Sequence, residues 1–182
     1  MTYNAHDLAR SFRTVRANTI QVAEEIPEDK YNFRPAEGVR TVAETLAHLA
    51  TSTGWPQEMH GNRLNAVDFA LFMGSLQKAQ TYAATLTTKA AIIDALRKEG
   101  EDFASWLETL PDDVLSEMVQ YPAGMEPPQK TRFEMLLSAK EHEMHHRGQL
   151  MLVQRMLGIT PHLTRRMQEA MAQMPQMASA QR

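Results

Sequence analysis

Histidine is concentrated in one short segment, KEHEMHHRGQLMLVQRMLG (residues 140–158). Three of the seven histidines in the chain, His142, His145 and His146, fall within five positions there. On a helix, His142 and His146 stand about 6 Å apart along the axis and close to one face. At this spacing both imidazoles can reach one metal ion. His145 lies about 100° round the helix from His146. We expect it to face solvent, or at most to lie behind a ligand.

Two ligands rarely suffice for a metal ion, so a third should come from another helix. The natural candidate is His48, which lies in TVAETLAHLA between Leu46 and Leu49, where the core of a helical bundle would begin. A histidine in a core is costly unless a partner satisfies its ring nitrogens. The chain has no cysteine, so a metal must rest on His, Asp, Glu or water. Spacing alone does not distinguish a metal site from two alternatives: a histidine pair on the helix surface, and a His48 that is hydrogen-bonded or half-exposed.

The same segment satisfies the H-E-x-x-H pattern of zinc proteases through His142, Glu143 and His146. The extension found in metzincins is absent, because an Arg-Gly-Gln sequence follows directly. The chain also offers no convincing strands for the sheet of such a protease. We therefore expect Glu143 to be a solvated helix carboxylate, with a role as general base as the alternative.

Helix signals dominate the elements that must position these residues. Residues 5–26 carry apolar side chains at three- and four-residue steps, the spacing of one buried helical stripe. Thr41 with Glu44 fits a capping box that opens a second helix. NAVDFALFMGSL reads as a short helix or helical linker. TKAAIIDALRKEGEDFASWLETL predicts a long helix that tolerates Gly100 at about 1 kcal/mol relative to alanine. The last strong helix spans residues 131–157.

The remaining segments predict shorter elements. PDDVLSEMV favours a helix start or a turn, and QYPAGMEPPQK a loop or a short hairpin. Four main helices indicate an all-α protein, a four-helix bundle. We assign residues 1–165 to this domain and residues 166–182 to a methionine-rich tail that can form a short helix with a loose end. The other histidines, at expected element ends, are assigned to the surface: His6, His60 and His162.

Bulk properties bound the class of protein. A chain of 182 residues with 43% hydrophobic and 23% charged residues is about one globular domain. A net charge of −3 offers no broad basic field, so neither nucleic acid nor an anionic membrane is an expected partner. The sequence shows neither the apolar core of a signal peptide nor an apolar run of about 18 residues. We therefore expect a cytoplasmic protein.

Two landmarks connect the chain with a known family. The run HEMHHRGQLMLVQRMLG matches H-x-x-x-H-R-G-Q. IPEDKYNFRPAEGVRTVAETLAHLA (residues 26–50) contains a helix end, a Tyr-x-x-x-Pro connection, and then a helix with a histidine. The two landmarks occur in order and about 95 residues apart. In these features residues 5–160 resemble the DinB-like superfamily, also called YfiT-like.

The resemblance implies an up-down-down-up four-helix bundle with a divalent metal at one end of its core. The ligands that it implies are His48, His142 and His146. Zn²⁺ is the first expectation, with Ni²⁺, Fe²⁺ or Mn²⁺ as alternatives, because imidazole suits several ions. Three neutral imidazoles leave a coordination position open, as in catalytic rather than structural zinc sites. A homodimer is also consistent with the resemblance.

The family's Arg-Gly-Gln motif falls on Arg147, Gly148 and Gln149. We expect Gly148 to allow close helix approach beside the site and Arg147 to point elsewhere, to an ion pair or the helix surface. Gln149 can lie near the metal as a hydrogen-bonding group, or it can be an ordinary polar helix position. Glu44, one turn before His48, can orient that ring, although the capping box is the favoured explanation for Glu44.

Three functions follow from such a site. The resemblance favours a thiol S-transferase-like enzyme, in which the metal keeps a low-molecular-weight thiol deprotonated and nucleophilic. The alternatives are a metal-dependent hydrolase and a non-enzymatic metal-binding stress-response protein. In each enzyme the substrate is a small molecule. The segments expected to shape its pocket are TGWPQEMHGNRLN and QYPAGMEPPQK.

Overall fold

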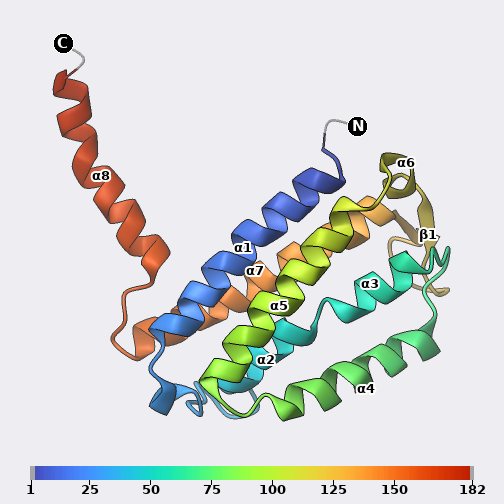
Figure 1. Ribbon diagram of the computed structural model, residues 1–182, viewed down its shortest axis with the longest axis horizontal. Helices are drawn as coiled ribbons and strands as arrows, with labels where there is room; N and C mark the ends of the chain where they lie inside the picture. Colours follow the sequence, from blue (N-terminus) through green and yellow to red (C-terminus); the bar gives the residue numbers. More distant parts are fainter. Residues whose placement is uncertain (1–2, 181–182) are drawn as a thin grey trace.

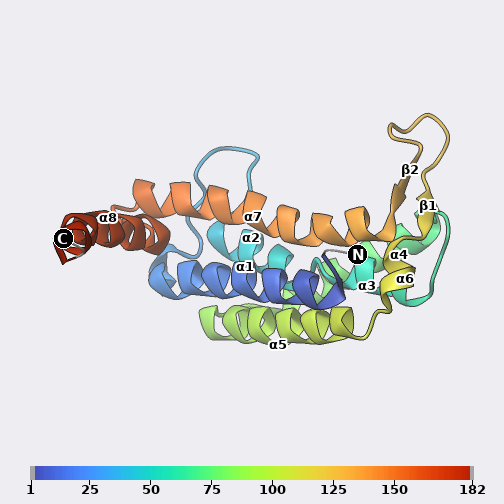
Figure 2. The same cartoon turned by 90° about the horizontal axis from the view of Figure 1, so that it is seen from above.

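Four helices form the body of the protein: α1 (Ala5–Glu25), α2 (Val42–Thr51), α5 (Lys89–Glu108) and α7 (Arg132–Met156). They lie side by side in both views of the computed structural model (Figures 1 and 2). The structure describes residues 3–180, and side chains as far as residue 174. Among the described residues, no helix is both long and apolar enough to cross a membrane.

The helix directions follow from the pairs that they form. Arg16 of α1 pairs with Glu143 of α7, and Glu25, further along α1, accepts a hydrogen bond from Gln154, further along α7. α1 and α7 are therefore parallel. α2 and α5 run the opposite way (Figure 1). The order is up-down-down-up, so the predicted four-helix bundle and its topology are confirmed.

Helix starts are set by side-chain caps. Thr41 Oγ1 accepts from the Glu44 amide at 3.1 Å, and the Glu44 carboxylate accepts from the Thr41 amide at 2.7 Å. The predicted capping box at α2 is thus confirmed. Arg34 holds the same carboxylate, so Glu44 serves the cap rather than the ring of His48.

Shorter elements complete the chain. Helix α3 (Gly54–Gly61) follows α2 directly. The segment predicted to be a short helix or a helical linker belongs to a longer helix, α4 (Phe69–Thr85), which packs against α2 and α3. The 3-10 helix η1 (Glu28–Lys30) follows α1, and α6 (Asp112–Leu115) follows α5. The strands β1 (Met118–Gln120) and β2 (Gln129–Thr131) form an antiparallel hairpin, and the QYPAGMEPPQK segment connects them.

The methionine-rich tail belongs to a helix, α8 (His162–Ala180), that begins before the expected tail boundary. It extends away from the bundle (Figures 1 and 2). Met167, Met171 and Met174 are exposed on it. The division of the chain at residue 165 stays a prediction.

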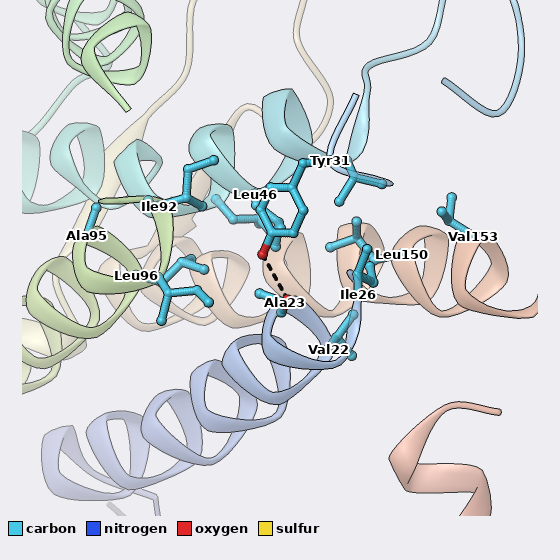
Figure 3. Close-up of a cluster of buried hydrophobic side chains, with 14 residues drawn as sticks. Val22, Ala23, Ile26, Tyr31, Leu46, Ile92, Ala95, Leu96, Leu150 and Val153 are labelled. Atoms are coloured by element: carbon cyan, nitrogen blue, oxygen red, sulfur yellow. Dashed lines mark hydrogen bonds between the residues drawn. The ribbon is translucent and has the colours of Figure 1, made fainter. Parts of the chain in front are cut away.

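Two apolar clusters form the core, one toward each end of the bundle. One includes Ile26, Leu46 and Leu150, together with Tyr31, whose hydroxyl donates to the carbonyl of Ala23 at 2.8 Å (Figure 3). The other includes Phe12, Phe103 and Leu136. Burial of these side chains supplies the main driving force for folding.

Between the two clusters lies a buried ion pair. The Arg16 Nε donates to both oxygens of Glu143, at 2.8 and 2.9 Å, and the two side chains are only 4% and 1% exposed. Arg16 also donates to the carbonyl oxygens of Leu96, at 2.9 Å, and Leu49, at 3.0 Å. One guanidinium thus connects all four bundle helices. The expectation that Glu143 is a solvated carboxylate is wrong, because Arg16 supplies the charge and hydrogen bonds that its burial requires.

Gly100 makes room for this ion pair. A Cβ atom at Gly100 would lie 2.7 Å from Cγ and 3.2 Å from Cδ of Arg16. Arg16 is fixed by its buried hydrogen bonds and cannot move aside. Packing against Arg16 therefore requires a glycine here. The predicted helix does not merely tolerate Gly100 at a cost in helix propensity.

Gly100→Ala should lower the free energy of unfolding by about 1–3 kcal/mol, the usual cost of overpacking a core. Gly74→Ala is the matched control, because a Cβ at Gly74 in α4 meets no atom within 4 Å. In the control, the better helix propensity of alanine should raise stability by about 0.5–1 kcal/mol. Urea unfolding of both variants measures the difference. Equal effects would show that Gly100 is an ordinary helix position.

Candidate metal centre

Three histidines from two helices converge at one point of the bundle. His48 comes from α2, and His142 and His146 from successive turns of α7. The Nε2 atoms of His48 and His142 lie 3.0 Å apart, and one ring nitrogen from each histidine lies within 4.8 Å of the other two. Nitrogen ligands in a tetrahedral zinc site lie about 3.4 Å apart, given Zn–N bonds of about 2.0–2.1 Å. The donor set therefore fits a divalent ion with small adjustments.

Gln149 orients one of the three rings. Its Oε1 lies 2.8 Å from Nδ1 of His146, and its Nε2 lies 3.1 Å from Nε2 of His145. The amide oxygen can only accept, so Nδ1 of His146 carries the proton and its Nε2 lone pair is free to ligate. Of the two roles expected for Gln149, the hydrogen-bonding one is present.

The three imidazoles are held in the neutral form that a metal requires. Burial, followed by the nearby charge of Arg40, lowers the pKa of His48 to about 4. Burial and the neighbouring His146 lower the pKa of His142 to about 4. Burial also lowers the pKa of His146, although the hydrogen bond that its Nδ1–H donates to Gln149 acts in the opposite direction. At neutral pH protons therefore compete little for these nitrogens.

Gln149→Leu should weaken zinc binding by about 10–100-fold, the usual cost of losing a group that orients a ligand. Gln149→Glu is the matched variant, because it keeps an oxygen acceptor for His146 and should retain most of the affinity. Competition with a chromophoric chelator measures both. Unchanged affinity in Gln149→Leu would show that the amide is an ordinary polar helix residue.

Two cavities flank the three histidines. The arginine-side cavity, of 570 Å³, lies between the connection before α2 and helix α7, and its lining includes Arg40, Val42, His146, Gln149 and Met156. The aromatic cavity, of 510 Å³, is lined by His48 and His142 together with residues of α3, α4 and the hairpin, among them Trp55, Phe72 and Tyr121. Arg40 also lines a smaller cavity of 370 Å³ that reaches His48.

Both segments expected to shape a substrate pocket contribute to the aromatic cavity. Trp55 and His60 come from TGWPQEMHGNRLN, and Tyr121 from QYPAGMEPPQK. The rings of Trp55 and Phe72 meet edge to face with centroids 5.2 Å apart. Helix α4 also lines this cavity, through Phe72 and Leu76. The sequence does not indicate this, because the apolar face of a helix does not show which groove it will cover.

Several expectations about the remaining residues are wrong. The surface positions predicted for His60 and His162 are wrong, because each residue is only 1% exposed. His60 is held by Arg132, and His162 packs at the start of α8 with its Nε2 near Asn18. Gly148 does not admit a neighbouring helix, because a Cβ there would meet no atom within 4 Å. His6 and His145 are exposed, as predicted.

Arg147 and Glu143 both lie outside the histidine cluster. Arg147 donates to the carbonyl oxygen of Val15 at 3.5 Å, on the α1 side of α7. Glu143 is bound by Arg16, so the H-E-x-x-H pattern does not place a free carboxylate beside the three rings. The geometry therefore lacks the general base that the zinc-protease pattern implies.

Comparison with known proteins agrees with this architecture. The model of the DinB family matches residues 1–177. The chain belongs to the DinB family. One member with a similar sequence is the uncharacterized protein YjoA of Bacillus subtilis, which is 25% identical over 160 residues, 86% of this chain and 92% of YjoA.

Solved DinB-like structures share the fold. The YjoA structure superposes with a TM-score of 0.62 at 24% identity, covering 84% of this chain and 92% of YjoA. A DinB-like protein from Bacillus cereus gives 0.66 at 17% identity, covering 88% and 97%. YfiT from Bacillus subtilis gives 0.65 at 17% identity, covering 86% and 89%, and is described as a probable metal-dependent hydrolase with an unusual four-helix bundle topology. At these identities the likeness establishes the fold alone.

Proposed function

We propose that the chain is a metal-dependent enzyme that joins a low-molecular-weight thiol, through its sulfur and with loss of the thiol proton, to a small electrophile. His48, His142 and His146 would hold the ion through their Nε2 atoms. We propose Zn²⁺, with Ni²⁺, Fe²⁺ or Mn²⁺ also compatible with three imidazoles. A divalent ion at this place supplies Lewis-acid chemistry, which keeps a thiol deprotonated near neutral pH.

The observation that carries this proposal is a pair of cavities, each lined by at least one of the three histidines. A transfer between two molecules needs two binding sites that open onto one reacting centre, and proximity supplies much of the rate enhancement. His146 lines the arginine-side cavity, while His48 and His142 line the aromatic cavity. Hydrolysis of one substrate by water would need only one of these cavities.

One cavity has a charged lining residue and the other is mainly apolar, which suits a charged thiol and an apolar electrophile respectively. Arg40 is a permanent cation on the arginine side, where it suits a thiol that carries a carboxylate. Its charge also acts on all three histidines, because it contributes to the lowered pKa of each. The aromatic cavity, with Trp55, Phe72 and Tyr121, suits an apolar electrophile.

A hydrolase is the second candidate, because YfiT, which has the same fold, is described as a probable metal-dependent hydrolase. Its weakness in this chain is the missing base. Glu143 is committed to Arg16, and no Asp or Glu is among the residues that line the aromatic cavity. A non-enzymatic metal-binding protein is the third candidate. The cytoplasmic location and the homodimer stay predictions.

Turnover assays separate the three candidates. Zinc-loaded protein should show saturable consumption of an electrophile only when a carboxylate-bearing thiol is present, and none after metal removal. Arg40→Met should raise the KM for the thiol about tenfold, the effect of losing one charge-assisted contact, with little change in kcat. Arg10→Met, which changes an exposed arginine of α1, is the control. Turnover with water alone would instead establish the hydrolase, and bound metal without any turnover the non-enzymatic protein.

A further inference from the structure

His60 is a second histidine site in the wall of the aromatic cavity, apart from the three that converge at the candidate metal centre. It lies on α3 and is 1% exposed, yet it lines the same cavity as His48 and His142. A buried imidazole at the edge of a cavity is costly unless its nitrogens have partners. Its hydrogen bonds therefore determine what it can offer to a bound molecule.

Arg132 fixes the tautomer of His60. Its Nη1 lies 3.1 Å from Nδ1 of His60, and its Nε donates to Glu117 Oε2 at 2.7 Å. Arginine has only donors, so Nδ1 of His60 must accept and its proton must sit on Nε2. Arg132 is itself 1% exposed and begins α7, so this arrangement is rigid.

The ring is also neutral at physiological pH. Burial, with the adjacent charge of Arg132 as the second cause, lowers the pKa of His60 to about 4. Among the described residues, no hydrogen bond is made to Nε2 of His60. The ring atom left for a ligand is thus a neutral N–H donor.

No acidic or basic side chain other than histidine lines the cavity around this donor. The hydroxyls of Thr51, Ser52 and Ser138 already donate to backbone carbonyl oxygens, and that of Ser75 donates to Glu58. The Tyr121 hydroxyl can rotate about its C–O bond, whereas the His60 ring is fixed by Arg132. A fixed donor in an apolar wall discriminates strongly between ligands with and without an acceptor, because the donor is left unpaired in the second case.

We propose that His60 donates its Nε2–H to a neutral carbonyl oxygen of the molecule in the aromatic cavity, and so selects apolar carbonyl compounds as ligands. Arg132 and Glu117 are the positioning residues that hold this donor in place. As a statement of substrate class the inference rests on the proposed function, since the carbonyl compound would be the electrophile. As a statement of binding it is tested without thiol or turnover.

The test uses acetophenone, which has a carbonyl acceptor, and ethylbenzene, which has a similar size without one. Zinc-loaded full-length protein is titrated with each by NMR. Wild type should bind acetophenone about fivefold more tightly than ethylbenzene, the effect of one neutral hydrogen bond of about 1 kcal/mol. His60→Phe should abolish the preference, and His60→Gln, which keeps an N–H donor, should restore part of it. His162→Phe, at a buried histidine outside the cavity, should leave it unchanged.

A preference that survives in His60→Phe would overturn the proposal, because the carbonyl would then be held elsewhere, for example by the metal. Long-range ¹H–¹⁵N NMR of the wild type gives an answer that needs no variant. It should find His60 neutral at pH 7 with its proton on Nε2. A proton on Nδ1, or a cationic ring, would also overturn it. If the wild-type protein shows no thiol-dependent turnover but still binds acetophenone more tightly than ethylbenzene, the transferase function is rejected and the role of His60 in binding stands.

Discussion

Zinc binding should weaken by more than a hundredfold in His48→Ala, and equally in His142→Ala and His146→Ala. Losing a group that only orients a ligand costs about 10–100-fold, and each of these changes removes a ligand itself. The three rings already meet, with one nitrogen from each within 4.8 Å of the others. Elemental analysis of the purified variants and competition with a chelator measure the loss.

His145→Ala is the matched control for these variants. His145 belongs to the same helix turn and lies beside His146, with ring centroids 4.9 Å apart, but it is exposed and contacts Gln149 instead. Its replacement should leave the metal content near that of the wild type. Equal metal content in all four variants would show that the convergence of His48 with the α7 pair has no ligand role.

The second large effect is on stability. Arg16→Met should lower the free energy of unfolding by about 3–5 kcal/mol, because it leaves the Glu143 carboxylate buried without a partner. It also removes the bonds to the carbonyl oxygens of Leu49 and Leu96. A loss of this size is a large fraction of the stability of a typical domain. Urea unfolding at neutral pH is the measurement.

A double variant tests whether the cost comes from the orphaned charge. Arg16→Met combined with Glu143→Leu removes both charges and should recover most of the stability, because apolar replacements of buried ion pairs are often neutral or stabilising. Arg10→Met, on the same helix, should change stability little, since its pair with Asp7 is exposed. If the double variant is as unstable as the single one, packing rather than charge accounts for the loss.

The same pair explains how the bundle holds the candidate centre in register. Glu143 follows His142 in α7, and Leu49 follows His48 in α2. Arg16 therefore donates hydrogen bonds to both histidine-bearing helices, in each case at the residue directly after a histidine. Glu143, which the H-E-x-x-H spacing would make the general base of a protease, is thus a structural residue. The double variant should accordingly fold yet bind zinc less tightly.

Much of the fold could be predicted because it follows from local rules. Apolar periodicity identifies α1, α5 and α7, and the Thr41–Glu44 capping box identifies the start of α2. The sequence also predicts the three converging histidines, through the spacing within α7 and the family landmark around His48. Helical spacing fixes which residues share a face.

Long-range partners could not be predicted, since they depend on which faces meet. Glu143 and His60 are polar residues in helices, and their spacing gives no sign of burial. Each is buried because an arginine from another helix, Arg16 or Arg132, supplies its hydrogen bonds. Gly100 carries the one local signal, a glycine inside a strong helix, and that signal indicates close approach without naming Arg16.

Anomalous diffraction from crystals of the purified protein, recorded on both sides of the zinc edge, tests the metal centre most directly. We expect a single strong peak about 2.0–2.1 Å from the Nε2 atoms of His48, His142 and His146, with a fourth position open toward the cavities. Crystals grown from zinc-supplemented protein that show no peak among these rings, or a peak held by other residues, would contradict this expectation.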